Sequence, residues 1–162
     1  TGGHSDHHTA SGADLPFFQQ HPGRPRSVAD GADTLITYDQ GKRCWINKAI
    51  FHLPAEQQQA RAANEAQRPV FSAGDSDTDL AFVQDATRLK LVINRNRVQL
   101  MCNAYANAQG RWLVQPMFVL PRAKQAAPYP CTSAVDADGQ LLADETGRRF
   151  TQDLEDSVYA LP

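Results

Sequence analysis

Short apolar runs alternate with stretches of helical periodicity through the middle of the chain. Residues 69–73, 89–94 and 112–120 have the largely unbroken apolar character of buried strands, and residues 79–86 and 98–108 carry apolar side chains at helical spacing. Strands that are separated by helices in this way pair in parallel, because each helix carries the chain back to the starting end of the sheet. The sequence therefore predicts an α/β fold with a parallel, Rossmann-like sheet.

Flanking segments predict further elements of this core. Residues 34–38 combine β-branched and aromatic side chains, which predicts a strand that enters a turn at residues 40–41. The Ala- and Gln-rich stretch from 47 to about 64 predicts a helix that is kinked or restarted at Pro54. Pro116 cannot donate a hydrogen bond to a neighbouring strand, so the last predicted strand belongs at the edge of the sheet.

These patterns divide the chain into three parts. Residues 1–33 are rich in His, Gly, Pro and Ser without a sustained period, which predicts an irregular arm. Residues 34–122 form the predicted core, and residues 123–162 contain turn signals that predict loops and a hairpin appended to it. A length of 162 residues suits one domain.

Composition excludes several classes of protein. The net charge is −2 and no long basic run occurs, which argues against a nucleic-acid-binding protein. No apolar stretch is long enough to predict a membrane span. The three cysteines, Cys44, Cys102 and Cys131, are too scattered for a zinc knuckle, although one pair could form a disulfide in an exported protein.

Residues 74–79 (GDSDTD) form the most informative motif. Asp75, Asp77 and Asp79 stand at alternate positions directly after a predicted buried strand. The carboxyl ends of parallel strands form the ligand crevice of open α/β sheets, so this loop predicts acids at that edge. Closely packed carboxylates repel one another unless a cation is present, and oxygen ligands favour Mg²⁺ before Ca²⁺. The alternative interpretations are a solvated acidic turn and an EF-hand loop, and the latter fails because Leu80 replaces the required glycine.

The acidic loop resembles the fourth motif of the haloacid dehalogenase superfamily, a hydrophobic strand followed by G-D-x-x-x-D. Asp75 and Asp79 match its two acids. The resemblance implies that Asp75, and less directly Asp79, hold Mg²⁺. Asp77 lies between them and is expected to be either an outer-shell ligand or a hydrogen-bond acceptor within the loop. It also implies a third-motif lysine at a helix start upstream. We assign that role to Lys48, expected close to Asp75, with Lys42 as the rival.

This resemblance is closest to the exported bacterial branch that includes phosphorylcholine phosphatases, and it covers the second half of the family's core. It implies hydrolysis of a small phosphorylated substrate through an aspartyl-phosphate, and a periplasmic or secreted location. The family's nucleophile lies on an earlier motif, D-x-D-x-T/V, which we expect in sequence N-terminal to this chain. Asp136, in residues 134–142, resembles such a motif superficially, but Asp138 and Gly139 favour a plain turn there.

Three consequences follow for the isolated chain. Without the attacking carboxylate, we expect no hydrolysis at an enzyme-like rate. A sheet that lacks its first strands exposes apolar surface, which predicts self-association or pairing with the missing N-terminal fragment. The competing hypothesis is a catalytically silent α/β domain that binds a metal or a partner protein.

Two further sets of residues have open interpretations. Arg95 and Arg97 follow a predicted strand and either meet a substrate phosphate or form a surface cluster. Trp112 lies in an apolar run and is predicted to be in the core, whereas the role of Trp45 stays undecided.

Overall fold

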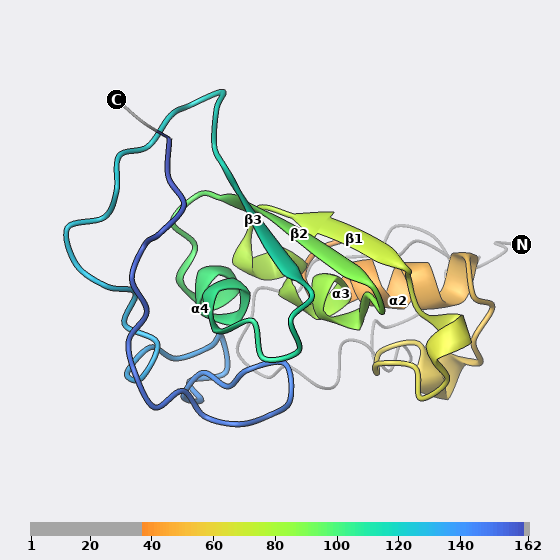
Figure 1. Ribbon diagram of the computed structural model, residues 1–162. Helices are drawn as coiled ribbons and strands as arrows, with labels where there is room; N and C mark the ends of the chain where they lie inside the picture. The colour runs from red at the N-terminus through yellow and green to blue at the C-terminus, as the bar shows by residue number, and fades with distance from the viewer. Residues whose placement is uncertain (1–36, 161–162) are drawn as a thin grey trace, which may run out of the picture. The chain divides into compact units, whose positions relative to one another are not determined.

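The computed structural model describes residues 37–160 and has a three-stranded parallel sheet at its centre. Strands β1 (Phe71–Gly74), β2 (Leu89–Asn94) and β3 (Trp112–Pro116) lie in the order β1-β2-β3 (Figure 1). The α/β class, the parallel pairing and the edge position of β3 are confirmed. The predicted arm at 1–33 lies outside the described residues.

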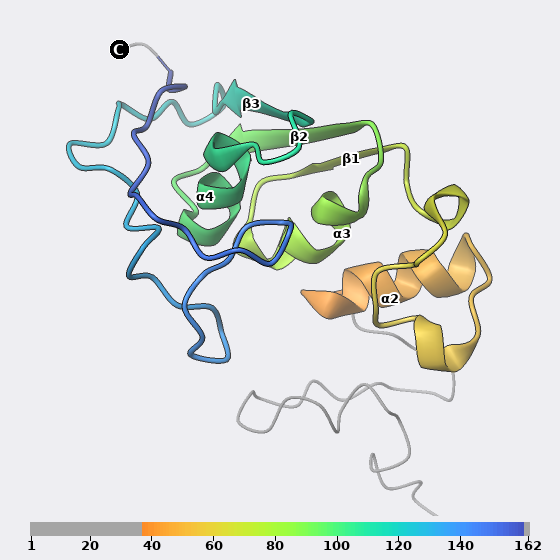
Figure 2. The same ribbon diagram turned by 60° about the horizontal axis from the view of Figure 1, so that its bottom comes forward.

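Helices connect these strands. The helix α3 (Leu80–Asp85) follows β1, and α4 (Val98–Ala106) follows β2, both as predicted. Asn107 ends α4 with a left-handed φ of 43°, a conformation that asparagine tolerates better than most residues. Both helices pack against the same face of the sheet, and α2 (Gln40–Ala49) packs against α3 (Figures 1 and 2).

The prediction for residues 37–64 was wrong in its boundaries. Residues 37–38 are not strand, and α2 begins at Gln40, where a turn was predicted. Gly41 is buried in the first turn of this helix, so tertiary packing outweighs the poor helix propensity of glycine. The helix ends before Pro54, which disfavours helical backbone at the preceding residue, and only short 3₁₀ turns follow.

The two faces of the sheet differ sharply. Side chains of the face that packs on α3 and α4 include Lys90, Val92 and Trp112, all buried. On the opposite face Phe71, Leu89 and Leu113 are 51%, 40% and 53% exposed. The strand register places Phe71 beside Leu89 and Leu91 beside Leu113, so these apolar side chains adjoin one another. Within the described residues no helix covers this open face (Figure 2).

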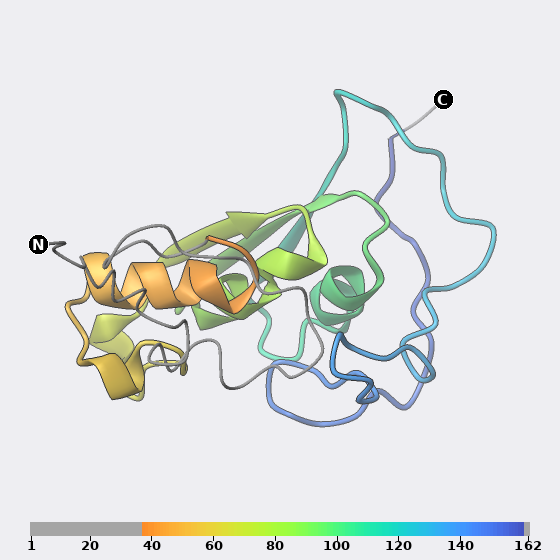
Figure 3. The ribbon, with the colours of Figure 1, turned by 180° about the vertical axis from the view of Figure 1, so that it is seen from behind.

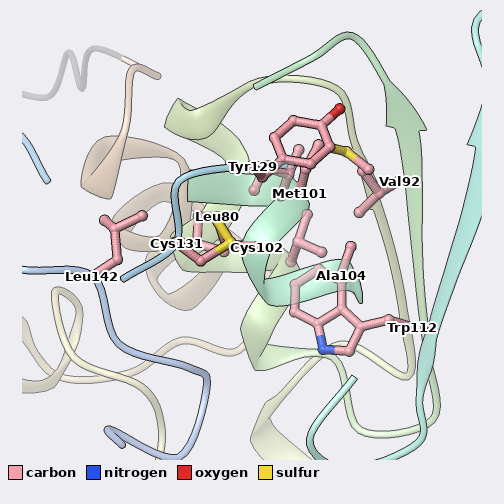
Figure 4. Packing of buried hydrophobic residues seen from close by; sticks show 11 residues of the cluster. Leu80, Val92, Met101, Cys102, Ala104, Trp112, Tyr129, Cys131 and Leu142 are labelled. Carbon is pink, nitrogen blue, oxygen red and sulfur yellow. A yellow bond between two sulfur atoms is a disulfide. The ribbon is translucent and has the colours of Figure 1, made fainter. Parts of the chain in front are cut away.

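A hydrophobic core joins the sheet, α4 and the C-terminal extension, residues 123–160. Tyr129, Cys131 and Leu142 of the extension belong to the same buried cluster as Met101 and Trp112, which confirms the core position of the tryptophan (Figure 4). The extension is irregular, with isolated bridges instead of strands, and it runs past α4 (Figure 3).

Covalent and ionic contacts fix the extension in place. A disulfide joins Cys102 of α4 to Cys131. Lys90 of β2 pairs with Glu145, and the side chains of both are almost completely buried. Burial lowers the pKa of Lys90, while the bond to Glu145 opposes this shift. In residues 37–160 no helix is long and apolar enough to cross a bilayer.

Candidate functional site

The loop after β1 turns back on itself through a close contact at Gly74. A Cβ atom added there would lie 2.6 Å from the Cβ of Asp79 and 3.0 Å from Cγ2 of Val83. Real Cβ atoms do not approach other carbons so closely, so this position requires glycine. The first residue of the motif thus lets the strand end and the following helix converge.

The carboxylate of Asp79 stabilises this loop through hydrogen bonds to the loop's own backbone. Its Oδ2 accepts hydrogen bonds from the backbone N–H groups of Asp75 (2.9 Å) and Ser76 (3.1 Å). The Ser76 side chain in turn accepts from the N–H of Thr78, which completes a capping box at the helix start. Asp79 is buried, and its second oxygen, Oδ1, accepts a hydrogen bond from Lys42. Both oxygens of this carboxylate are therefore engaged by the protein.

Lys42 reaches the acidic loop from the first turn of α2. Its Nζ contacts Oδ1 of Asp79 and lies 3.2 Å from Oγ1 of Thr78. The adjacent Arg43 donates to both oxygens of Asp85 in α3, at 2.7 Å and 2.8 Å, and to the carbonyl of Ala81 at 2.6 Å. This two-pronged contact holds the start of α2 against α3 and thereby directs Lys42 toward the loop.

The position of Lys48 differs from the expectation for the third-motif lysine. Lys48 was assigned because it was expected at a helix start, yet it lies in the last turn of α2. It is about 9 Å along the helix axis from Lys42, which occupies the first turn. The expected approach of Lys48 to Asp75 stays a prediction. Lys42, the rival residue, has the helix-start position and contacts the loop.

Asp75 lies at the outer side of the loop and pairs with Arg95. Nη1 of Arg95 is 2.8 Å from Oδ2 of Asp75, and the two side chains are 34% and 40% exposed. Arg95 directly follows β2, so the pair bridges the carboxyl ends of neighbouring parallel strands. This is the edge at which the sequence predicted a ligand crevice. Arg97, by contrast, is exposed at the start of α4.

The backbone on both sides of Arg95 is held by the C-terminal extension. The hydroxyl of Tyr129 lies 3.1 Å from Oδ1 of Asn94 and 3.0 Å from Oδ1 of Asn96. Burial raises the pKa of Tyr129 to about 12, so the hydroxyl keeps its one proton near neutral pH and can donate it to either amide oxygen. Asn94 also donates to the buried carboxylate of Asp156 at 2.9 Å. Buried hydrogen bonds thus hold the backbone on either side of Arg95, whose guanidinium is partly exposed.

Asp77 has a structural role. Its Oδ1 accepts the backbone N–H of Leu100, in the first turn of α4, at 2.9 Å. That amide has no partner within the helix, and a negative charge suits a helix N-terminus. The three acids therefore point to three different partners: an arginine, a helix start and a lysine with two amides.

The side chains of the acidic loop offer few ligands for Mg²⁺. Among residues 37–160, no group of three or more His, Cys, Asp or Glu side chains comes together to hold a metal. Mg²⁺ nevertheless commonly binds through one or two carboxylates and retains several waters. Asp75 is the best placed carboxylate, since Asp79 is occupied by Lys42 and two amides.

Other candidate residues lie outside this site. Asp136 accepts the backbone N–H groups of Asp138 and Gln140, both at 2.9 Å, as expected of a turn. Cys44 is buried and unpaired, and burial raises the pKa of its thiol while Lys48 opposes that shift. Trp45 is 43% exposed.

Sequence reasoning did not anticipate two contributors. Arg43 and Tyr129 position the two cations of the site, Lys42 and Arg95. Each acts across at least 33 residues of chain, and no local sequence pattern predicts such contacts.

Comparisons with protein-family models, with curated proteins and with solved structures found no match.

Proposed function

We propose that this chain is part of a Mg²⁺-dependent phosphatase of the haloacid dehalogenase type, acting on a small phosphorylated substrate. The observation that supports it best is the arrangement at the carboxyl edge of β1 and β2. There Lys42 contacts Asp79, and Arg95 contacts Asp75. Two cations beside an acidic loop suit a ligand that carries both phosphate charge and a divalent ion.

Each residue has a distinct role in this proposal. Asp75 would hold Mg²⁺, which neutralises phosphate charge when bound. Asp79 fixes the loop and orients Lys42, whose compact ammonium group stabilises negative charge on the phosphoryl group or the nucleophile. Asp77 ties the loop to α4. The attacking carboxylate, which would form the aspartyl-phosphate, is proposed to lie in sequence N-terminal to this chain.

Metal binding by the chain tests this proposal. Titration calorimetry with MgCl₂ should detect weak binding that Asp75→Asn abolishes. Asp138→Asn is the matched control, because it removes the same charge from an exposed turn in the C-terminal extension. Binding that survives in the Asp75 variant would overturn the assignment.

Activity supplies a second test. The 162-residue chain, assayed with an aryl phosphate and Mg²⁺, should show no enzyme-like turnover. Turnover that disappears in Asp136→Asn would instead identify that residue as a permuted nucleophile.

The competing proposal is a catalytically silent α/β domain that binds a metal or a partner protein. It is favoured by the separate engagement of all three acids of the loop. A chain that fails to bind Mg²⁺ would favour the partner-binding form of this alternative.

An exported location forms part of the proposal. The Cys102–Cys131 disulfide supports it, because such bonds persist in oxidising compartments such as the periplasm.

A further inference from the structure

The backbone around Arg95 is held by buried hydrogen bonds, whereas its guanidinium is accessible to solvent. Asn94 and Asn96 hold the backbone on either side of Arg95 through Tyr129, which is itself fully buried. The guanidinium is 34% exposed and bonds to Asp75 through Nη1. A guanidinium carries five N–H donors in a planar fork, so one contact leaves donors that can turn toward an incoming anion.

A conflict arises if Asp75 also serves as a metal ligand. Oδ2 of Asp75 accepts a hydrogen bond from Arg95, 2.8 Å away. A cation held by the same carboxylate would repel the guanidinium and so weaken its bond to Asp75. A guanidinium released from Asp75 would remain at the carboxyl edge of the sheet, because buried hydrogen bonds hold its backbone.

We propose that Arg95 is an exchangeable phosphate-recognition residue: it pairs with Asp75 in the resting chain and transfers to a phosphoryl oxygen when the ligand binds. This inference rests on the proposed function for the role of the metal. The phosphate-binding half of it can be measured without metal. The chemical class of the ligand is a phosphate or a phosphate monoester, which accepts two parallel hydrogen bonds from a guanidinium.

The first test uses inorganic phosphate and phenyl phosphate in metal-free buffer, with binding followed by two-dimensional NMR. Arg95→Gln should weaken binding of both by about 10-fold, since a hydrogen bond to a charged group is lost. Asp75→Asn should tighten binding by about 2- to 5-fold, because it releases Arg95 from an exposed ion pair. Binding of phenyl phosphate but not of inorganic phosphate would identify the monoester as the ligand.

Arg148→Gln is the matched control for this test. Arg148 is an exposed arginine that lies 3.9 Å from the carboxylate of Asp144, away from the site. Its substitution should leave phosphate affinity unchanged. If Arg148→Gln weakens binding as much as Arg95→Gln does, the anion binds through general charge and the inference is wrong.

A second titration separates this inference from the proposed function. Arg95→Gln should bind Mg²⁺ about 2- to 5-fold more tightly than the unmodified chain, because the competing ion pair is gone. Mg²⁺ binding that depends on Asp75 but is unchanged in Arg95→Gln would refute the exchange and leave the proposed function intact. If the unmodified chain binds no Mg²⁺ but still binds phosphate through Arg95, the proposed role of the metal is refuted. Arg95 would then be an anion-binding residue without a metal.

Discussion

Substitution of Glu145 by glutamine should strongly destabilise the fold. Lys90 and Glu145 are 0% and 1% exposed, and the carboxylate also accepts the indole N–H of Trp112 at 3.0 Å. The ammonium group of Lys90 lies 5.2 Å from the centre of the same ring. The substitution leaves a buried cation without its counter-charge, which costs about 3 kcal/mol. For a chain of this size, that loss lowers the melting temperature by about 10 °C.

Thermal unfolding followed by circular dichroism measures this effect. Lys90→Met combined with Glu145→Gln removes both charges, and its free energy of unfolding should return to within about 1 kcal/mol of that of the unmodified chain. Lys90→Met alone should destabilise the fold as much as Glu145→Gln alone, because it leaves the buried carboxylate of Glu145 without its counter-charge. A melting temperature that is unchanged in Glu145→Gln would show that the pair is not buried and that the extension does not dock on β2 as described.

Three other predictions concern the extension and the open face of the sheet. Joint replacement of Cys102 and Cys131 by alanine removes a disulfide that spans 29 residues of sequence. This should lower the free energy of unfolding, measured in urea, by about 3.5 kcal/mol. The control Cys44→Ala keeps the disulfide and should not show this loss. Burial acts to raise the pKa of Asp144, yet hydrogen bonds from its own turn outweigh it and lower the pKa below the ordinary value of 3.8. The stabilisation by this group is present above that value and is lost as the pH falls through the folded-state pKa, so Asp144→Asn should reduce the fall in melting temperature between about pH 5 and pH 3. Finally, the chain should self-associate through its open face, and Leu113→Glu should shift it toward the monomer in size-exclusion chromatography with light scattering; an unchanged mass would exclude that face.

The central strands could be predicted because their signals are local. Residues 69–73 form a short, largely apolar run and residues 89–94 are rich in Leu, Val and Ile, and Gly74 with the acids that follow it marks the end of the first strand. The position of the acidic loop at the carboxyl edge follows from parallel pairing alone. The core position of Trp112 and the turn at Gly139, with φ of 77°, follow from equally local patterns.

The start of α2 and the partners of the acids could not be predicted in this way. A glycine at position 41 indicates a turn locally, but the residue is buried in the first turn of α2. The helix-start position expected for Lys48 depended on that boundary, and Lys48 instead lies in the last turn of α2. The acids themselves were found from the motif, whereas their partners Lys42 and Arg95 lie 37 and 20 residues away and become neighbours only in the folded chain.

Mn²⁺ titration monitored by NMR tests the central claim most directly. Mn²⁺ occupies oxygen sites of the kind that bind Mg²⁺, and it broadens signals of nearby nuclei. The amides of residues 74–79 and of Arg95 should broaden first, and Asp75→Asn should remove that effect. Broadening centred elsewhere, or unchanged in the Asp75 variant, would contradict a metal site at the carboxyl edge of β1.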